Sequence, residues 1–416
     1  MTPPRTPGPA KRTPARERAT RPAGARAAAK SLPTPVVSAS RYETVALVLQ
    51  GGGALGAYQC GVYEALHDSG LRPNWFAGTS IGAINAAILA GNAPENRLAR
   101  LRDFWDTVCE PAGALWPTSA TAAMLEWLPG SASFASGFDA LSAIGAIVQG
   151  QRGFYGVRSL PPFALADGSA AATSFYDTSP LKTTLERLVD FDRIHDSGVR
   201  LSVGAANVRT GNVRYFDSAR ERIRPEHIMA SGALPPAFPA IMIEGEPYWD
   251  GGIVSNTPLD YVLEAEPRSD SLVLQVDLWS ARGKAPRTMM EVFERQKDIQ
   301  YSSRTRFGTD TVARLQKLRN ALSHLIEKVP RAKLEPALLA DLEPWLCDRV
   351  FNIVHLIYQA KQTEEQYKDY AFSPSTMRAH WASGQDDMHR SLTHAEFFVP
   401  PRRGSGVVTH DIHRRR

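Results

Sequence analysis

A serine with a glycine two positions away on either side lies at the centre of the sequence Gly78-Thr79-Ser80-Ile81-Gly82. This GxSxG spacing is typical of a nucleophile elbow, in which the serine occupies a sharp turn between a strand and a helix. The glycines remove side chains that would collide with that strand and helix. Ser80 would then face the unpaired N–H groups of a helix N-terminus, which favour developing negative charge. The motif is short, so an ordinary Gly/Ser turn is the alternative interpretation.

A glycine-rich loop comes before the elbow, between an apolar segment and a helical pattern. Its Gly51-x-Gly53-x-x-Gly56 spacing is that of a dinucleotide-binding loop. That interpretation expects an acidic residue at the end of the next strand, where this chain has the Ser80 elbow. The alternative is an oxyanion hole, in which Gly51, Gly52 and Gly53 aim backbone N–H groups at a tetrahedral intermediate. An oxyanion hole accounts for both glycine motifs, and nucleotide binding stays open as the rival.

A nucleophilic serine needs a base, and Asp250 is the candidate that the sequence offers. Asp250-Gly251-Gly252 directly follows an aromatic pair, which suits a strand that ends in a tight turn. A common Asp-Gly turn is the alternative. Among the ten histidines, His227 is the best partner for a triad, although a capping or surface role suits its position before a short helix better. A carboxylate alone suffices if burial raises its pKa enough for it to accept the serine proton.

Apolar runs of strand length lead into both glycine motifs. Residues 44–49 are continuously apolar and lead into the glycine loop, and residues 75–79 lead into the elbow. Such runs are typical of parallel strands that are buried on both faces, so the sequence predicts an α/β sheet. Residues 201–208 and 213–216 read as a β-hairpin. Residues 271–279 are expected to form the last strand of the sheet.

After Gly283 the sequence favours helices. Residues 288–329 and 334–370 are charged and helix-favouring, and Ser375 is placed to cap one more helix. The apolar stripe that indicates a helix in the second of these segments comprises Val350, Ile353, Val354 and Ile357. We therefore expect an all-helical extension, which is also a candidate surface for homo-oligomer formation.

The segment 111–151 is unusually apolar, because Glu126 and Asp139 are its only charged residues. An ordinary buried insertion explains this composition. The sharper hypothesis is a cap or lid whose apolar face meets lipid.

Basic residues are concentrated at the two ends of the chain. Residues 1–40 hold eight basic residues and one acidic residue, and residues 401–416 hold five and one, so the body is net −6 although the whole chain is +5. We expect the Pro/Ala/Arg-rich N-terminal tail to be disordered; a transit peptide, or weak attraction to anionic membrane or nucleic acid, is the alternative to a solvated tail. Three cysteines without metal-like spacing favour a reducing compartment. No apolar stretch reaches the roughly 20 residues of a spanning helix.

Taken in order, the glycine loop at 50–56, the Ser80 elbow and Asp250-Gly251-Gly252 resemble the patatin-like phospholipase family. The stretches 176–188 and 230–235 are also similar to that family, and this match covers roughly residues 43–280. The helical region after Gly283 falls outside it but resembles an extension seen in some bacterial patatin-like proteins.

The resemblance implies a three-layer α/β/α fold and the hydrolysis of acyl lipids by a Ser–Asp dyad, without a metal or organic cofactor. Ser80 would be the nucleophile, Asp250 the base, and the loop from Gly51 to Gly53 the oxyanion hole. Leu55 departs from the pattern, because many members have a basic residue in the glycine loop. That departure bears on how an anionic head group would be bound.

We therefore predict a patatin-like sheet domain at 41–282 with a cap insertion at 93–175, a helical extension at 283–400, and basic tails at 1–40 and 401–416. The expected activity is phospholipase- or lysophospholipase-type hydrolysis of carboxylic esters through an acyl-enzyme. An esterase or thioesterase for non-phospholipid acyl or polyester substrates is one alternative, and a non-catalytic nucleotide- or lipid-binding scaffold is another. The expected partner is an acyl lipid or membrane surface rather than a specific nucleic acid. The expected location is the cytoplasm, with peripheral membrane association as a variant of it.

Overall fold

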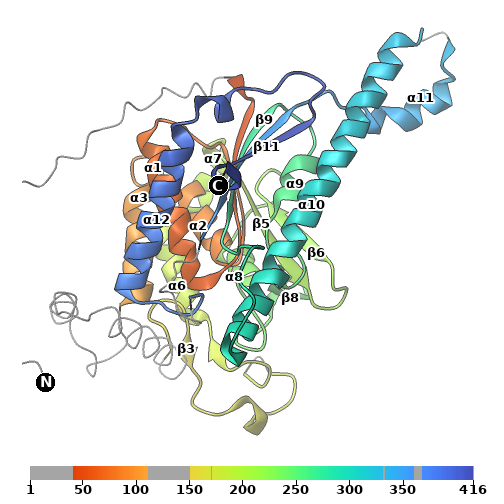
Figure 1. The fold of residues 1–416 in the computed structure, drawn as a ribbon. Helices are drawn as coiled ribbons and strands as arrows, with labels where there is room; N and C mark the ends of the chain where they lie inside the picture. Colours follow the sequence, from red (N-terminus) through yellow and green to blue (C-terminus); the bar gives the residue numbers. More distant parts are fainter. Residues whose placement is uncertain (1–40, 111–149, 170, 331–332, 360–367, 416) are drawn as a thin grey trace, which may run out of the picture. The chain divides into compact units, whose positions relative to one another are not determined.

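The structure is a computed structural model that describes residues 41–110, 150–169, 171–330, 333–359 and 368–415. The strands of its main sheet are β1 Thr44–Leu49, β2 Trp75–Thr79, β5 Arg200–Asn207, β6 Val213–Asp217, β7 Ile241–Ile243, β8 Glu246–Asp250, β9 Ser271–Asp277, β10 Phe351–Ile357 and β11 Val407–Asp411. Within the described ranges these nine strands pair in the order β11-β10-β9-β1-β2-β5-β8-β7, with β6 beside β5 (Figure 1). A separate two-stranded ribbon pairs β3, Gly156–Val157, with β4, Tyr176–Asp177.

The central strand β1 is buried on both faces. Leu47 and Leu49 belong to one hydrophobic cluster, and the alternate residues Ala46 and Val48 belong to another. A strand covered on both sides has no polar face, which is why its sequence is continuously apolar. β1 pairs in parallel with β2 and with β9. The predicted α/β fold is confirmed, and so is the hairpin of β5 and β6.

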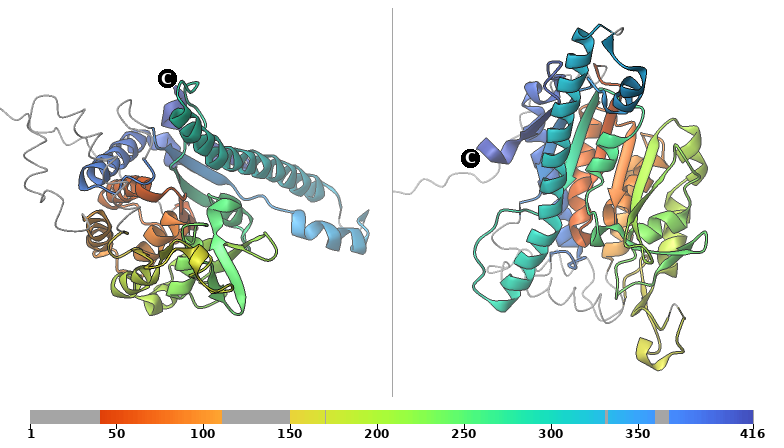
Figure 2. Two further views of the ribbon diagram at one scale, coloured as in Figure 1. Left: turned by 90° about the horizontal axis from the view of Figure 1, so that it is seen from below. Right: turned by 90° about the vertical axis from the view of Figure 1, so that its right-hand side faces the viewer.

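Helices cover both faces of this sheet (Figure 2). The helices are α1 Ala57–Asp68, α2 Ile81–Ala90, α3 Arg97–Cys109, α6 Ser179–Leu188, α7 Phe191–Asp196, α8 Pro225–Ser231, α9 Leu259–Glu264, α10 Met289–Lys328, α11 Pro336–Leu342 and α12 Pro374–Leu392. Short 3-10 helices span Gly53–Gly56, Pro162–Ala164, Gly251–Ile253, Glu343–Trp345, Ala395–Phe398 and Ile412–Arg415. Helices α1, α2, α3 and α12 share a cluster with Leu47, whereas α9 and α10 share one with Val48.

Helix α12, late in the chain, packs closely against α1, early in the chain. A Cβ on Gly61 would lie 1.8 Å from the carbonyl oxygen of Trp381, and a Cβ on Gly384 would lie 2.0 Å from that of Tyr58. Only glycine allows the two backbones to come this close. The Tyr58 hydroxyl also donates a hydrogen bond of 2.8 Å to Asp387. The C-terminal region is therefore part of the same layered structure as the first helix.

The C-terminal region differs from the prediction in its strands and in the cap of its last helix. Helices α10 and α12 are present, but strand β10 occupies the place of the expected helical stripe, and β9 is followed in the sheet by β10 and β11 rather than ending it. Ile353 and Val354 belong to opposite clusters. The spacing that resembled one helix face thus belongs to a strand buried on both faces. The cap of α12 is Ser373, whose side chain accepts the Thr376 N–H, and not Ser375.

Two predicted stretches fall outside the described residues: the N-terminal tail at 1–40 and the central part of the expected cap insertion, 111–149. The described residues all lie in one compact unit that spans Pro35–Arg416. No helix among them combines the length and the apolar character needed to cross a membrane.

Candidate active site

Ser80 occupies a sharp turn between β2 and α2. Its backbone angles, φ 56° and ψ −126°, lie in a region that a residue with a side chain rarely adopts. A Cβ on Gly78 would lie 2.2 Å from the carbonyl oxygen of Gly82, and one on Gly82 would lie 2.3 Å from that of Leu49. Both flanking glycines are therefore required by close backbone contacts, as the elbow interpretation expects.

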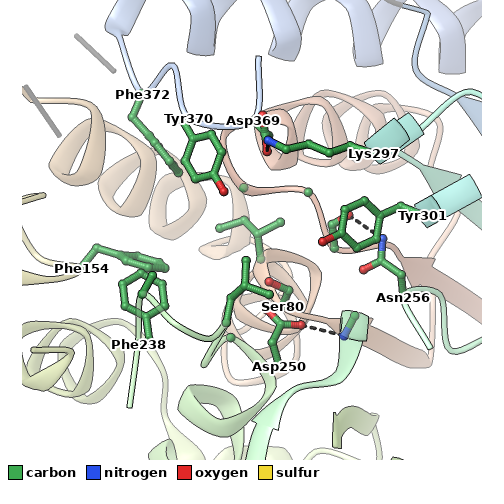
Figure 3. Close-up of a pocket in the computed structure, with 18 of the residues that line it drawn as sticks. Ser80, Phe154, Phe238, Asp250, Asn256, Lys297, Tyr301, Asp369, Tyr370 and Phe372 are labelled. Carbon is green, nitrogen blue, oxygen red and sulfur yellow. Dashed lines mark hydrogen bonds and ion pairs between the residues drawn. The ribbon is translucent and has the colours of Figure 1, made fainter. Parts of the chain in front are cut away.

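Asp250 reaches Ser80 through the register of the sheet. Strand β5 extends past the end of β2, because Thr79 is paired with Gly204, and β8 pairs antiparallel with the overhanging part, so that Ala205 is opposite Asp250. The last residue of β8 therefore lies level with the elbow. Figure 3 shows the Ser80 and Asp250 side chains pointing toward each other, with the Ser80 hydroxyl facing the carboxyl group of Asp250.

The Asp250 carboxyl group is only 2% exposed. Burial raises its pKa to about 6, while hydrogen bonds from Ser80 and from the Gly252 N–H, the latter 2.7 Å long, act in the opposite direction. A carboxyl group with this pKa is mostly ionised at neutral pH and still binds a proton far better than an exposed aspartate. Asp250 is thus suited to accept and return the proton of Ser80.

The glycine loop is fixed in place by Asn256. The Gly51 N–H donates to the Asn256 carbonyl over 3.2 Å, and the Asn256 side chain donates 3.0 Å back to the Gly51 carbonyl (Figure 3). Within the described part of the chain, the Gly52 and Gly53 amides donate to no protein acceptor. Gly53 has φ +56°, and a Cβ there would lie 2.2 Å from the carbonyl oxygen of Asp369. Of the three predicted oxyanion donors, Gly52 and Gly53 have free amides, and the Gly51 amide holds the loop.

The remaining motif glycines also stand at crowded positions. A Cβ on Gly56 would lie 2.6 Å from the Ile81 side chain, one on Gly251 would lie 2.4 Å from the Gly204 carbonyl oxygen, and one on Gly252 would lie 2.8 Å from the Asn256 side-chain oxygen. These contacts join the glycine loop, the elbow and the Asp250 turn.

Ser231, at the end of α8, was not predicted from the sequence as part of the site. Its hydroxyl accepts the Ser80 N–H over 3.0 Å and donates to the Gly204 carbonyl over 2.6 Å. It therefore ties the strained backbone of the elbow to strand β5. The only sequence signal for it was its place in the stretch 230–235 that resembles the family.

The site opens into a cavity of about 390 Å³ with a largely aromatic wall. The aromatic residues that line it are Phe154, Tyr155, Tyr176, Phe238, Trp279, Tyr301, Tyr370 and Phe372. They come from segments far apart in the sequence. Burial raises the pKa of Tyr370 to about 12, so its phenol is neutral at physiological pH. Such a cavity suits an apolar chain attached to a polar reacting group.

Apart from Asp250, the charged groups of the cavity lining come from the C-terminal region. Lys297 lines the cavity, forms an ion pair of 2.8 Å with Asp369, and lies 4.5 Å from the centre of the Tyr370 ring. Leu55, the position at which the glycine loop lacks a basic residue, is fully buried. The cation nearest to the reacting groups in this lining is therefore on α10 rather than in the loop.

His227 has a structural role in the geometry seen here. Its Nδ1 accepts the Arg224 N–H over 3.0 Å at the start of α8, and its ring stacks on Phe216. Burial and nearby arginines lower its pKa to about 4. It does not line the cavity, and among the described residues no group of three His, Cys, Asp or Glu side chains is arranged to hold a metal ion.

The family model described as patatin-like phospholipase matches residues 47–263, which is more than half of the chain and includes Ser80 and Asp250. The chain belongs to the patatin-like phospholipase family. A second model, described as patatin phospholipase, matches residues 299–403. This match agrees with the resemblance of the C-terminal region to an extension of patatin-like proteins, and it includes the cavity residues Tyr301, Tyr370 and Phe372.

Two curated relatives of this patatin-like chain match it over short segments only, and the chain spans a small part of their length. The lysophospholipase nte1 of Aspergillus terreus is 50% identical over 50 residues, which is 12% of this chain and 3% of that protein. The triacylglycerol lipase ptl3 of Schizosaccharomyces pombe is 42% identical over 59 residues, 14% of this chain and 12% of that protein. The solved structure of VipD from Legionella pneumophila is 15% identical, with a TM-score of 0.37 over 84% of this chain and 67% of that one. That structural likeness is too low to support an argument.

Proposed function

We propose that this patatin-like chain hydrolyses carboxylic esters of acyl lipids with Ser80 as nucleophile and Asp250 as base. The observation that carries the proposal is the position of the Ser80 side chain, on its strained turn, facing a buried carboxyl group with a raised pKa. Membership of the family supports lipid as the substrate class, as do the lysophospholipase and lipase names of the two short matches.

The proposed reaction proceeds in two halves. Ser80 Oγ attacks the ester carbonyl carbon while Asp250 accepts the serine proton, and the collapse of the tetrahedral intermediate expels the alcohol, which takes the proton from Asp250. Water then attacks the acyl-enzyme and gives a proton to Asp250. Release of the fatty acid returns that proton to Ser80 Oγ, so each cycle ends with the groups as they began.

Two further features support this cycle. The free amides of Gly52 and Gly53 lie at the cavity beside Ser80, where they would donate to the oxyanion of each tetrahedral intermediate. The aromatic wall gives the acyl chain an apolar environment. Because the glycine loop faces the same cavity as Ser80, its position favours an oxyanion hole over a nucleotide site.

The test is intact-mass labelling with a fluorophosphonate lipid analogue. We expect one adduct on the wild type, none on Ser80→Ala, and much slower labelling of Asp250→Asn. Ser255→Ala is the matched control, because Ser255 is a half-buried serine nearby whose hydroxyl accepts from Tyr215 and should not affect labelling. A folded wild type that takes no label, with or without lipid vesicles, would contradict the proposal.

A further inference from the structure

Two segments that flank the active-site cavity expose large apolar side chains. Val157, Leu160, Phe163 and Phe175 belong to the segment 150–176, and Met289, Val292 and Phe293 belong to the first turns of α10. Phe163 is 91% exposed and Phe293 is 54% exposed. These seven residues are called the apolar rim below. Grouped, exposed apolar side chains of this size are uncommon on the surfaces of soluble proteins and mark sites of interaction.

The two parts of the apolar rim belong to segments that line one cavity. Tyr155 and Tyr176, from the segment 150–176, line it on one side, and Lys297 and Tyr301, from α10, line it on another. Figure 1 and the right-hand view of Figure 2 both show this segment and the first turns of α10 at the same end of the sheet. A flat apolar phase that touched both parts would therefore face the cavity entrance.

Basic residues accompany one part of the rim. The linker 280–288, which leads into α10, contains Arg282, Lys284 and Arg287 and no acidic residue, and all three are exposed. This contrasts with the body of the chain, which is net −6. Exposed basic residues next to exposed aromatic and aliphatic ones are the pattern of a surface that binds anionic lipid.

We propose that the apolar rim and the linker 280–288 dock the protein on an anionic lipid surface with the cavity entrance facing the lipid. The rim residues enter the interface between head groups and acyl chains, and Arg282, Lys284 and Arg287 contact the anionic head groups. The purpose of such docking, which is to bring lipid to the active site, rests on the proposed function. The binding itself does not require catalysis and can be measured without it.

Vesicle sedimentation of the full chain tests this surface, with Ser80→Ala in every sample so that the lipid is not consumed. Phosphatidylcholine vesicles with and without phosphatidylglycerol are compared. Replacing Phe163 and Phe293 together by serine should weaken binding by at least about tenfold, because their rings lose an apolar environment. The matched control replaces Leu318 and Leu325, which are 65% and 58% exposed farther along α10, by serine and should change nothing.

Charge is tested separately. Replacing Arg282 and Lys284 by glutamine should weaken binding to the anionic vesicles by about fivefold for each charge. Lys317 and Lys328, exposed on the distal half of α10, are the matched control pair. High salt should remove the effect of the charge variant and leave that of the phenylalanine variant. The N-terminal tail is the same in every sample and cannot produce a difference between variants.

Three outcomes would overturn the surface: no binding by the parent chain, binding by the phenylalanine variant that equals the parent, or equal losses in the control variants. Equal binding to both kinds of vesicle would overturn the anionic part. Turnover of a soluble short-chain ester, measured with Ser80 intact, separates this from the catalytic proposal. Ester turnover without vesicle binding would refute only the proposal of a docking surface. Vesicle binding without ester turnover would refute only the proposed hydrolysis.

Discussion

Residues 44–277, which hold both proposed reacting groups, and residues 289–411, which hold neither, build the same cavity in different ways. The first region supplies Ser80 and Asp250 from turns at strand ends, where a few local residues set the geometry. The second supplies Tyr301 and Tyr370 as walls, from a long helix and from a segment before α12. The difference indicates that the chemistry depends on local turn geometry, and the shape of the cavity on contacts between distant segments.

The contrast between the two regions predicts that the largest loss of activity follows substitution of Asp250. Asp250→Asn removes the base and should lower kcat/KM by about 10²- to 10⁴-fold. In the wild type, the logarithm of kcat/KM should rise with slope one up to a bend near pH 6, because Asp250 must be ionised and its pKa is about 6. A pH–rate profile with a soluble ester checks this. A variant that retains the bend would assign it to another group.

The same carboxyl group should cost stability. Its pKa rises from 3.8 to about 6 on folding, so its contribution to stability is fully present below pH 3.8 and is lost as the pH rises through 6. Asn can still accept from the Gly252 N–H. Asp250→Asn should therefore gain up to about 3 kcal/mol over the wild type at pH 8 and lose that advantage near pH 4. Urea unfolding at both pH values measures it, and an equal gain at both would exclude ionisation as the cause.

A substitution at Gly53 probes the place where the two regions meet. A methyl group there would collide with the Asp369 carbonyl at a positive φ, so Gly53→Ala should lower kcat by about 10²- to 10³-fold through displacement of the oxyanion donors. Gly70→Ala is the control. Gly70 has φ +80° and no atom within 4 Å of the place that a methyl group would take, so it carries the backbone penalty without a collision. Equal activity losses in both variants would contradict the assignment.

Ser231→Ala should have a smaller effect. It removes the acceptor of the Ser80 N–H and should reduce kcat by up to about tenfold while KM is unchanged, since the hydrogen bond, worth up to about 1.5 kcal/mol, holds the elbow rather than the substrate. Ser231→Thr keeps the hydroxyl and should recover part of the loss. A change in KM alone would show that Ser231 contacts the substrate instead.

The smallest effect on the chemical step itself is expected in the wall contributed by the second region. Tyr370→Ala should raise KM for long-chain esters by about tenfold, from lost apolar contact, and leave turnover of a short-chain ester unchanged. Tyr370→Phe keeps the ring and should match the wild type. A fall in kcat for the short ester would break the contrast, because it would give the C-terminal region a part in the chemistry.

The same contrast explains what could be predicted from the sequence. The elbow, the glycine loop and the Asp250 turn were recognisable because each motif holds its glycines within a few residues of the chain, although some of the contacts that require glycine, such as Gly53 with Asp369 and Gly251 with Gly204, join distant segments. Strand β10 was misread as a helix because Ile353 and Val354 face opposite clusters, and a doubly buried strand leaves no alternation to detect. Local spacing also carries no information on which strands become neighbours.

The missed parts of the site share this cause. Tyr155, Phe238 and Tyr370 meet only after folding, so no spacing in the sequence joins them. The unequal roles of Gly51 and Gly52 follow from Asn256, far along the chain, which accepts the Gly51 N–H. The pKa of Asp250 is raised because its carboxyl group is buried. From the sequence, this burial could be named as a requirement of the mechanism but could not be predicted.

The sheet order also has a consequence for biosynthesis. Strand β1 can pair with β9 only after residues 271–277 are synthesised, and β9 can pair with β10 only after residues 351–357 are synthesised. The edge of β9 would stay unpaired until then, and that of β10 until β11 follows. Pairing over such separations is slow and leaves intermediates prone to aggregate. The Asp369 carbonyl accepts the Ala54 N–H beside the glycine loop, and this contact too forms late. A nascent chain would thus hold its serine and aspartate long before it held a finished cavity, and it would need protection from aggregation during that interval.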